Sequence, residues 1–400
     1  MKILYIGTVT DNAWFEKLVS NSSSKPSAAP QTFENTLLKG IKKIGFENIE
    51  CLTFPMIGAF PKSRFLYWGK EKQVLDCGVQ TTFIPAINLK GIKMFSQLIS
   101  SRNLIKKWLE ENRNEAEVCV LMYSIYGPIA KNVVNLCRKY NSKCVAFVPD
   151  LPEHMYMAKK GIGKFVSRFY VASVKKIQGK FSGYIYLTDA MHERISNTKP
   201  YIVVEGLADE EIFAPQPKDG KKSSVVMYAG AVSKTFGVDR LTEGFRKSNI
   251  DAQLHIYGSG EYVGELKAIC LKDERIKYMG RVSHSEILQK EREAELLLNL
   301  RNPSDDFTKY SFPSKTMEYM ASGTPVLTTR LEGIPEEYFK YCYSVNDNNV
   351  DTVKNELERI FSLSPTERKE LGERAKSFIK DNKTGEIQAG RILNFLESLF

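Results

Sequence analysis

Short apolar runs alternate with longer amphipathic stretches along most of this chain, and this alternation limits the possible folds more than any other feature of the sequence. Runs such as KILYIG, EVCVLMYS and KCVAFVPD are too short and too rich in β-branched or aromatic residues to be core helices, so each predicts a buried parallel strand. Stretches between the runs, such as IAKNVVNLCRKY, have apolar residues at helical spacing. Strands that alternate with helices in this way predict a doubly wound α/β fold.

The alternation occurs in two series, which indicates two domains. A chain of 400 residues also exceeds what one hydrophobic core usually organises. The pattern lapses over 206–223, where proline, glycine and charged residues predict an interdomain linker. We therefore expect two Rossmann-like doubly wound domains, over 1–205 and 224–383, which face each other across a central cleft. A final amphipathic helix over 384–400 follows, and its packing back onto the N-terminal domain is one arrangement that the sequence allows.

Composition excludes several other classes of protein. Hydrophobic residues make up 42% of the chain, with 22 phenylalanines and 19 tyrosines, so disorder is excluded as its main state. No run approaches the roughly 18 apolar residues of a membrane span, and the N-terminus lacks the apolar segment of a signal peptide, so we expect a cytoplasmic protein. The 7 cysteines include no C-x-x-C pair, which argues against a disulfide framework and a thiolate metal site.

The net charge of +10 is concentrated in the N-terminal half. Residues 1–200 contain 29 Lys and Arg against 15 Asp and Glu, a net +14, whereas 201–400 contain 28 against 32, a net −4. Nucleic acid and an anionic membrane surface both attract a half of this kind.

The densest basic part is 155–187, which contains no acidic residue and has apolar residues at helical spacing. This pattern predicts a basic amphipathic helix that holds the protein peripherally on the inner face of the cell membrane. The alternative is a solvated basic face over an ordinary core stripe. The basic residues are Lys159, Lys160, Lys164, Arg168, Lys175, Lys176 and Lys180, and the apolar ones are Phe165, Val166, Phe169, Tyr170 and Val174.

Residues 310–328, YSFPSKTMEYMASGTPVLT, carry the most information about function. Pro313 suits the first turn of a helix and leaves the N–H groups near Ser314 and Lys315 free to point at an anion such as a diphosphate. One turn later, Glu318 can accept hydrogen bonds from two neighbouring hydroxyls, the arrangement that the 2′,3′-diol of a ribose presents. The stretch therefore predicts a nucleoside diphosphate site.

This stretch resembles the nucleotide-sugar site of family-4 glycosyltransferases of the GT-B fold, in the bacterial polysaccharide branch, where YSFPSK…EY.ASG.PV recurs. The likeness extends through VVMYAGAV, LHIYGSGEY, RIKYMGRV and LLLNLRNPSDDFTKYSFPSK, and through the shorter VPDLPE, YLTDAM and VVEGL. It implies that the chain transfers a sugar from a nucleoside diphosphate sugar, with UDP as the expected nucleotide, and retains the anomeric configuration. The implied acceptor is a glycan or a polyprenyl-linked saccharide held by the N-terminal domain, and no separate cofactor is implied.

The resemblance also assigns donor-binding roles to individual residues. Glu318 matches the second glutamate of the family's E-x7-E motif, which binds the donor ribose. The first glutamate of the motif falls on Tyr310, so Asp305 or Asp306 becomes the candidate for the sugar hydroxyls. Asp150, at the end of KCVAFVPD, resembles the family residue that approaches the donor sugar and the acceptor.

The phosphate-binding Arg and Lys of the family fall on Ala231 and Phe236 in this chain. Departure of a nucleoside diphosphate places negative charge on the β-phosphate, and a preorganised cation must stabilise it. No D-x-D triplet is present, so we expect no metal ion. Lys234, Arg301 or Lys315, together with the helix N-terminus, would then neutralise the diphosphate.

Other functions remain open at this point. Asp150 suits the N-cap of a helix near Pro152 equally well. Gly258, Gly260 and Gly264 follow a strand as G-x-G-x-x-x-G, which raises an NAD-type oxidoreductase, but the next strand ends without the acidic residue that holds the adenosine ribose. In the resemblance, these glycines let a loop approach the nucleotide. A sugar-nucleotide epimerase on the same fold is a further alternative, and no recognition module supports a nucleic-acid-binding protein.

Overall fold

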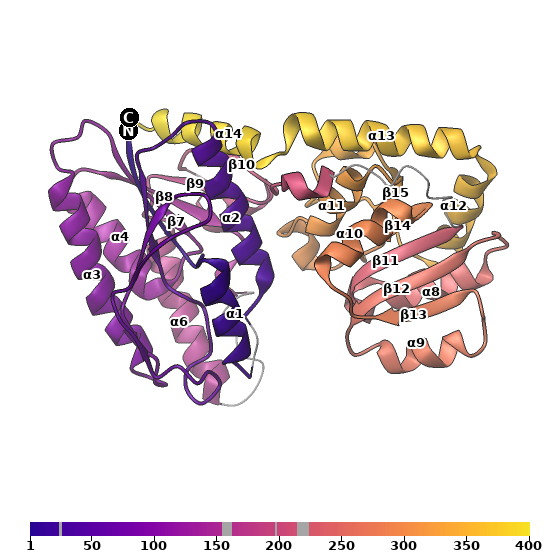
Figure 1. Cartoon of the computed structure of the whole chain (residues 1–400), viewed down its shortest axis with the longest axis horizontal. Helices are drawn as coiled ribbons and strands as arrows, with labels where there is room; N and C mark the ends of the chain where they lie inside the picture. The colour runs from indigo at the N-terminus through magenta and orange to yellow at the C-terminus, as the bar shows by residue number, and fades with distance from the viewer. Residues whose placement is uncertain (24–25, 154–161, 197, 214–223) are drawn as a thin grey trace. The chain divides into compact units, whose positions relative to one another are not determined.

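The computed structural model describes residues 1–400 apart from 24–25, 154–161, 197 and 214–223 (Figure 1). The chain divides into two compact units, and each is described by itself. Unit 1 contains Met1–Leu207 and Gly385–Phe400, and unit 2 contains Ala208–Thr384.

Residues 208–213, which we expected in the linker, belong to unit 2. The backbone N–H of Ala208 donates to the carbonyl of Lys383 at 2.8 Å, and a short 3-10 helix, η1, covers Glu210–Phe213. The apolar side chains of Ala208 and Ile212 are buried in the hydrophobic core of unit 2, which places this stretch in that unit. The rest of the expected linker, 214–223, lies outside the described residues.

Unit 1 is built on an eight-stranded sheet in the order β10-β9-β8-β7-β1-β2-β5-β4. Neighbouring strands are parallel except β4 and β5. The order of the strands reverses between β1 and β7, as in doubly wound folds. The strands are β1 (Lys2–Gly7), β2 (Ile49–Thr53), β4 (Lys72–Val74), β5 (Gln80–Phe83), β7 (Val118–Tyr123), β8 (Lys143–Val148), β9 (Gly183–Tyr186) and β10 (Tyr201–Val203), with β3 (Tyr67–Trp68) and β6 (Ala86–Ile87) in a separate antiparallel pair.

The helices of unit 1 include the last helix of the chain. This helix, α14, lies beside α2 (Figure 1), and the contact is so close that a Cβ on Gly40 would stand 2.2 Å from the carbonyl oxygen of Gly385. Only glycine at position 40 permits this approach. The helices are α1 (Asn12–Ser20), α2 (Ala28–Lys43), α3 (Lys93–Glu111), α4 (Gly127–Lys139), α6 (Ile162–Gln178), α7 (Met191–Ile195) and α14 (Gly385–Glu397).

A buried carboxylate ties α2 to the loop after β1. Glu34 is fully buried and accepts hydrogen bonds from the Tyr5 hydroxyl at 2.9 Å and from the backbone N–H of Thr8. Burial raises the pKa of Glu34 to about 7, although the hydrogen bonds from Thr8 and Tyr5 act in the opposite direction. Glu34 therefore holds this loop at the carboxyl edge of the sheet.

The described part of α6 packs as a core helix. Val171 and Val174 are buried, and the Tyr170 hydroxyl accepts a hydrogen bond from the N–H of Gly127 at 3.0 Å. Part of the stripe that we expected on a membrane thus faces α4, because apolar residues at helical spacing serve a core equally well. Lys159, Lys160 and the side chains of Lys164, Phe165 and Val166 lie outside the described residues.

Unit 2 is built on a six-stranded parallel sheet in the order β13-β12-β11-β14-β15-β16. This order reverses between β11 and β14, the switch point of a Rossmann-like fold. The strands are β11 (Val225–Ala231), β12 (Gln253–Ser259), β13 (Ile276–Gly280), β14 (Leu296–Asn299), β15 (Val326–Thr329) and β16 (Tyr343–Val345). The helices are α8 (Val238–Lys247), α9 (Val263–Cys270), α10 (His284–Glu293), α11 (Ser314–Ser322), α12 (Val350–Ser362) and α13 (Pro365–Asn382), with short 3-10 helices η2 (Lys234–Phe236), η3 (Asp306–Lys309) and η4 (Glu336–Lys340).

Local sequence signals start several of these helices. Ser364 and Glu367 form a capping box at α13, and Pro365 occupies the first turn, where its missing N–H is not needed. Each sheet has the buried, β-branched strands that the sequence predicts. Among the described residues, no helix combines the length and the apolar character required to cross a bilayer.

Candidate functional site

The switch point of unit 2 brings together the loops that follow β11 and β14. Gly237 has a φ of +73°, and a Cβ there would stand 2.0 Å from the carbonyl oxygen of Leu300. The two loops therefore touch at the carboxyl edge of the sheet. In open α/β sheets, ligands bind at this edge where the strand order reverses.

A cation without a carboxylate partner lies at this point. The guanidinium of Arg301, two residues after β14, lies 4.9 Å from the centre of the Phe236 ring. Its Nε is buried and has no hydrogen-bond partner, and within the described ranges no ion pair involves Arg301. Burial lowers the pKa of Arg301, but a guanidinium stays charged at neutral pH. Phe236, at the position where the family resemblance expects a lysine, thus supports an arginine from the neighbouring loop.

Lys234 lies in the same loop as Phe236 but is exposed and paired. Its Nζ lies 2.8 Å from the Glu265 carboxylate, and 5.5 Å from the centre of the Tyr262 ring. The hydrogen bond with Glu265 raises the pKa of Lys234. An exposed pair of this kind is weak and exchanges readily with other anions.

Lys315 and Glu318 form a buried cluster with Glu291 of α10. The Lys315 Nζ lies 3.1 Å from Oε1 of Glu291 and also pairs with Glu318, one turn further along α11. Glu291 is fully buried, and its Oε2 has no hydrogen-bond partner. The Lys315 ammonium, which the sequence suggested for the diphosphate, is therefore engaged by carboxylates of unit 2.

The two carboxyl groups of this cluster differ in pKa. Burial raises the pKa of Glu291 well above its ordinary value. For Glu318, burial acts in the same direction, but Lys315 and Glu291 outweigh it, so the pKa of Glu318 lies below its ordinary value. Of the two carboxylates, Glu318 is therefore the one that ionises more readily.

Contacts to the sheet fix the position of α11. The Tyr319 hydroxyl donates to the Ala229 carbonyl at 3.1 Å and accepts from the Ala229 N–H at 2.8 Å, and Asn299 donates to the Thr316 hydroxyl at 2.8 Å. Pro313 caps the helix and Ser314 is exposed in its first turn. The N-terminus of α11 therefore opens at the same edge as the loops after β11 and β14.

The candidates for the sugar hydroxyls lie between β14 and α11. Asp306 is exposed at the start of η3, and Asp305 accepts a hydrogen bond from the Asn302 amide at 3.3 Å. Tyr310 is half-buried and ends η3. These residues lie in one loop that leads to the N-terminus of α11.

Gly258 and Gly260 approach the backbone of the strand next to them. Gly258 has a φ of +130°, and a Cβ there would stand 1.8 Å from the Gly230 carbonyl oxygen. A Cβ on Gly260 would stand 2.2 Å from the Val232 carbonyl oxygen. Gly258, near the end of β12, and Gly260, just after it, therefore bring their backbone close to the end of β11 and the residues that follow it.

Asp150 lies in unit 1, whereas the other candidates lie in unit 2. It follows β8 by two residues at the carboxyl edge of that sheet and is exposed. Its charge, after burial and Glu34, contributes to raising the pKa of Tyr123. The edge that carries Asp150 also carries the loop held by Glu34.

The sequence did not single out Glu291 or Glu265. A signal for Glu291 was present, because Ile287, Leu288 and Glu291 recur at helical spacing on the buried face of α10. A glutamate on such a face needs a buried partner. Within the part of the chain that the structure describes, no group of three or more His, Cys, Asp or Glu side chains is placed to hold a metal ion.

Comparison with known proteins identifies the family of unit 2. Residues 209–378 match the family described as "Glycosyl transferases group 1". No curated protein sequence matches the chain.

Solved structures of glycosyltransferases share the fold over the whole chain. Sucrose-phosphate synthase from Thermosynechococcus elongatus superposes with a TM-score of 0.66 at 15% identity, over 100% of this chain and 99% of that one. Anabaena Alr3699/HepE in complex with UDP gives 0.63 at 14% identity, over 100% of both chains. The lipopolysaccharide outer core galactosyltransferase WaaB gives 0.63 at 15% identity, also over 100% of both chains. This chain therefore has the GT-B fold of these glycosyltransferases, and its residues 209–378 match a glycosyl transferases group 1 domain.

Proposed function

We propose that this glycosyltransferase moves a sugar from a UDP-sugar to a lipid-linked or saccharide acceptor during synthesis of a bacterial surface polysaccharide, with retention of the anomeric configuration. The observation that carries the proposal is the unpaired Arg301, held over Phe236 at the switch point of unit 2. A half-buried cation without a carboxylate partner at a ligand-binding edge is suited to an anionic ligand. The HepE structure in complex with UDP supports the choice of nucleotide, and WaaB, a lipopolysaccharide outer core galactosyltransferase, supports the choice of acceptor class.

In this proposal, Arg301 and the N–H groups at the start of α11 bind the diphosphate. As the sugar leaves UDP, negative charge develops on the β-phosphate, and a preorganised cation stabilises that charge more than it stabilises the ground state. Lys234 contributes once the diphosphate replaces Glu265 as its partner. Ser314 adds a hydroxyl beside the same helix N-terminus.

Glu318 binds the ribose diol, and Lys315 keeps it charged. Asp305 or Asp306 contacts the sugar hydroxyls, and Tyr310 lies beside them in place of the family's glutamate. Gly258 and Gly260 shape the loop next to the nucleotide. In unit 1, Asp150 orients the acceptor, because it lies at the carboxyl edge where acceptors bind in this fold.

We also propose that the protein works in the cytoplasm, bound peripherally to the inner face of the cell membrane, where a polyprenyl-linked acceptor is available. The net +14 of residues 1–200 supports this placement, because anionic lipid attracts such a half. Nucleic acid is not a proposed partner, and no metal ion or separate cofactor is required in this scheme.

The test is a donor screen by calorimetry with UDP, other nucleoside diphosphates, UDP-sugars and NAD. We expect UDP and at least one UDP-sugar to bind with micromolar affinity and NAD not to bind. Turnover of the bound UDP-sugar should require an added saccharide or lipid acceptor. Binding of NAD alone would contradict the proposal in favour of an oxidoreductase, and epimerised or hydrolysed sugar without acceptor would favour an epimerase on the same fold.

A further inference from the structure

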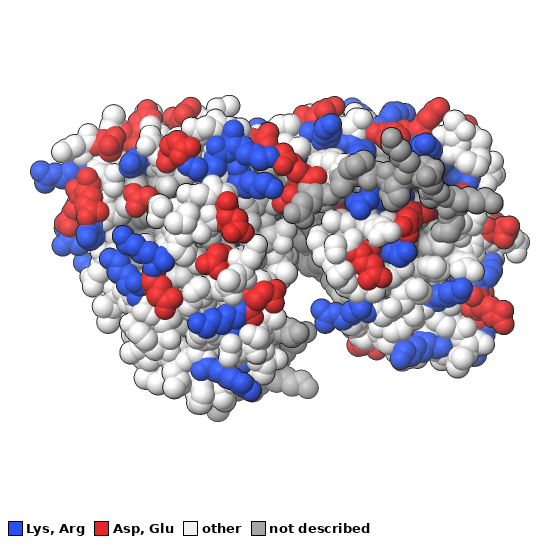
Figure 2. All heavy atoms as spheres, viewed as in Figure 1, with Lys and Arg blue, Asp and Glu red and all other residues white. Residues whose placement is uncertain are grey.

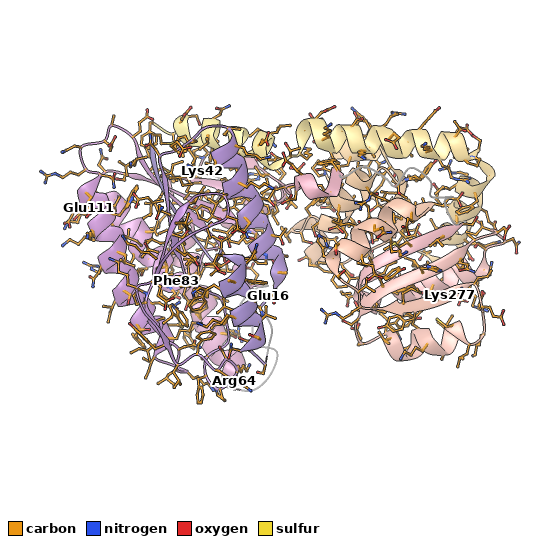
Figure 3. The ribbon with its side chains drawn as sticks, viewed as in Figure 1. Glu16, Lys42, Arg64, Phe83, Glu111 and Lys277 are labelled. Atoms are coloured by element: carbon orange, nitrogen blue, oxygen red, sulfur yellow. The ribbon has the colours of Figure 1, made fainter. Side chains whose placement is uncertain are left out.

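Large apolar side chains are exposed together at one end of unit 1. Figure 3 labels Arg64 at this end and Glu111, the last residue of α3, at the other. In Figure 2, viewed from the same side, the lower end of unit 1 is mostly uncharged on the face toward the viewer. The exposed residues that the argument uses are Leu66, Tyr67, Ile87, Ile92, Phe95 and Ile99, defined here as the apolar surface.

Hydrogen bonds show that these residues form one surface. Tyr67 and Ile87 are directly paired across β3 and β6. The N–H of Asn88 donates to the Leu66 carbonyl at 2.7 Å, which places Leu66 beside the same strand pair. The pair is exposed because its other face, with Trp68 and Ala86, packs on the core of unit 1.

Helix α3 continues the same surface. The N–H of Ile87 donates to the Ser96 hydroxyl at 3.0 Å, so this face of α3 lies against the end of β6. Ile92, Phe95 and Ile99 have the i, i+3, i+7 spacing of one helix face, next to Ser96. The opposite face of α3 is buried through residues such as Ile105 and Trp108.

The exposure is too large for an ordinary solvent-facing surface. Phe95 is 69% exposed, Ile99 64%, Tyr67 60% and Leu66 52%. A contiguous group of this kind on a soluble domain indicates an interaction site. Burying such side chains is favourable in any apolar phase, including the acyl region of a bilayer.

Exposed basic residues flank the apolar surface in the sequence. Arg64 precedes Leu66 by two residues, Lys90 lies between Ile87 and Ile92, and Arg102 follows Ile99 by one helical turn. Between positions 62 and 102, six exposed basic residues compare with two exposed acidic ones. The basic residues are Lys62, Arg64, Lys70, Lys72, Lys90 and Arg102, and the acidic ones are Glu71 and Asp76.

We infer that this apolar surface with its basic rim docks on an anionic lipid surface. Aromatic and aliphatic side chains enter the boundary of the bilayer while the rim stays at the headgroups, a division that charge complementarity favours over a protein partner. The inference rests on the proposed membrane location and moves it from the helix predicted over 155–187 to residues 64–102. It also places the bilayer at the carboxyl edge of the unit 1 sheet, where α3, α4 and α6 begin in Figure 1.

The test is co-sedimentation of the full chain with vesicles of phosphatidylcholine alone or mixed with phosphatidylglycerol. The double variant Phe95→Ser, Ile99→Ser should lower the partition coefficient onto the mixed vesicles at least about tenfold. The triple variant Arg64→Gln, Lys90→Gln, Arg102→Gln should lower it by about fivefold per residue at low salt, with a smaller effect at high salt. The matched control in unit 2 is Leu271→Ser with Lys272→Gln and Lys277→Gln, which changes an 89% exposed leucine and two exposed lysines.

Each outcome decides the inference. Loss of binding in the two unit 1 variants and not in the control supports it. It is overturned if the double variant binds like the wild type, or if replacing Lys159, Lys160, Lys164 and Arg168 by Gln removes binding while the double variant does not. It is also overturned if the wild type ignores vesicles but forms a dimer, measured by light scattering, that the double variant separates.

A second measurement guards against a folding defect. A Phe95→Trp variant should be quenched by brominated lipid in the mixed vesicles, and a Leu271→Trp variant should not. Calorimetry with UDP tests the donor site of the same variants, and its result does not depend on whether they bind vesicles. The vesicle assay, in turn, does not depend on whether UDP binds. The two proposals can therefore fail separately.

Discussion

The Nζ of Lys315 lies 3.1 Å from Oε1 of Glu291, a glutamate that is completely buried in unit 2. This contact links α10 to α11 and holds the half-buried lysine beside a buried carboxylate. Lys315 then faces Glu318 on its own helix, so the charge of Glu318 is set inside the domain. The lysine that the sequence offered for the diphosphate acts, in our proposal, on the glutamate that binds the ribose.

Replacing Glu318 by alanine should weaken UDP binding by about 1.5 to 3 kcal/mol, the range for hydrogen bonds to a charged group. The loss should be specific to the ribose hydroxyls. Calorimetry should compare the dissociation constants of UDP and 2′,3′-dideoxy-UDP for the wild type and for the variant. The wild type should bind UDP more tightly than the dideoxy nucleotide, and the variant should bind the two equally. If a folded variant still distinguishes them as the wild type does, Glu318 does not bind the ribose.

Replacing Arg301 by glutamine should weaken UDP binding by about 1.5 to 3 kcal/mol and uridine binding hardly at all, because the guanidinium is assigned to the diphosphate. Arg374→Gln on α13 is the matched control, since Arg374 also lies over an aromatic ring, 5.9 Å from the centre of Tyr341. Equal losses for UDP and uridine, or an equal effect of the control, would show that Arg301 acts on the fold and not on phosphate.

Glu34 should make the stability of unit 1 depend on pH. Its folded pKa of about 7 lies above the ordinary value of 4.5, so its contribution is full below about pH 4.5 and is lost as the pH rises through 7. A shift of this size corresponds to about 3 kcal/mol. Glu34→Gln, which cannot ionise, should lack this part of the pH dependence.

Tryptophan fluorescence can follow this effect in unit 1 alone. The 3 tryptophans of the chain, Trp14, Trp68 and Trp108, all lie in unit 1. Denaturant unfolding at pH 4.5, 6 and 8 should therefore report the stability of that unit. Parallel pH profiles for wild type and Glu34→Gln would be incompatible with the buried, protonated carboxyl.

Sugar transfer should persist in excess EDTA. Cationic side chains and a helix N-terminus take the role of a divalent ion in the proposed site, so removing metal should leave the rate within about twofold. The control is a metal-dependent glycosyltransferase in the same buffer. Activity that disappears with EDTA and returns with magnesium or manganese would contradict this scheme.

The sequence alone determined the type and order of the secondary structure. Alternating buried strands and amphipathic helices in two series led to parallel sheets covered by helices, since helices on both sides of a parallel sheet bury both faces of such strands. It also located the α11 stretch, because Pro313 and Gly323 mark the ends of that helix in the local sequence.

The sequence could not decide which partner each charged side chain would meet. Lys315 and Arg301 are both basic residues near one sheet edge, but Lys315 is paired with Glu291 from α10, and Arg301 lies over Phe236 from another loop. The same limit explains the stripe of α6, where helical spacing predicts an apolar face but not whether that face meets lipid or α4. Periodicity is local, whereas ion pairing and burial depend on contacts between segments far apart in the chain, and only the tertiary structure brings those segments together.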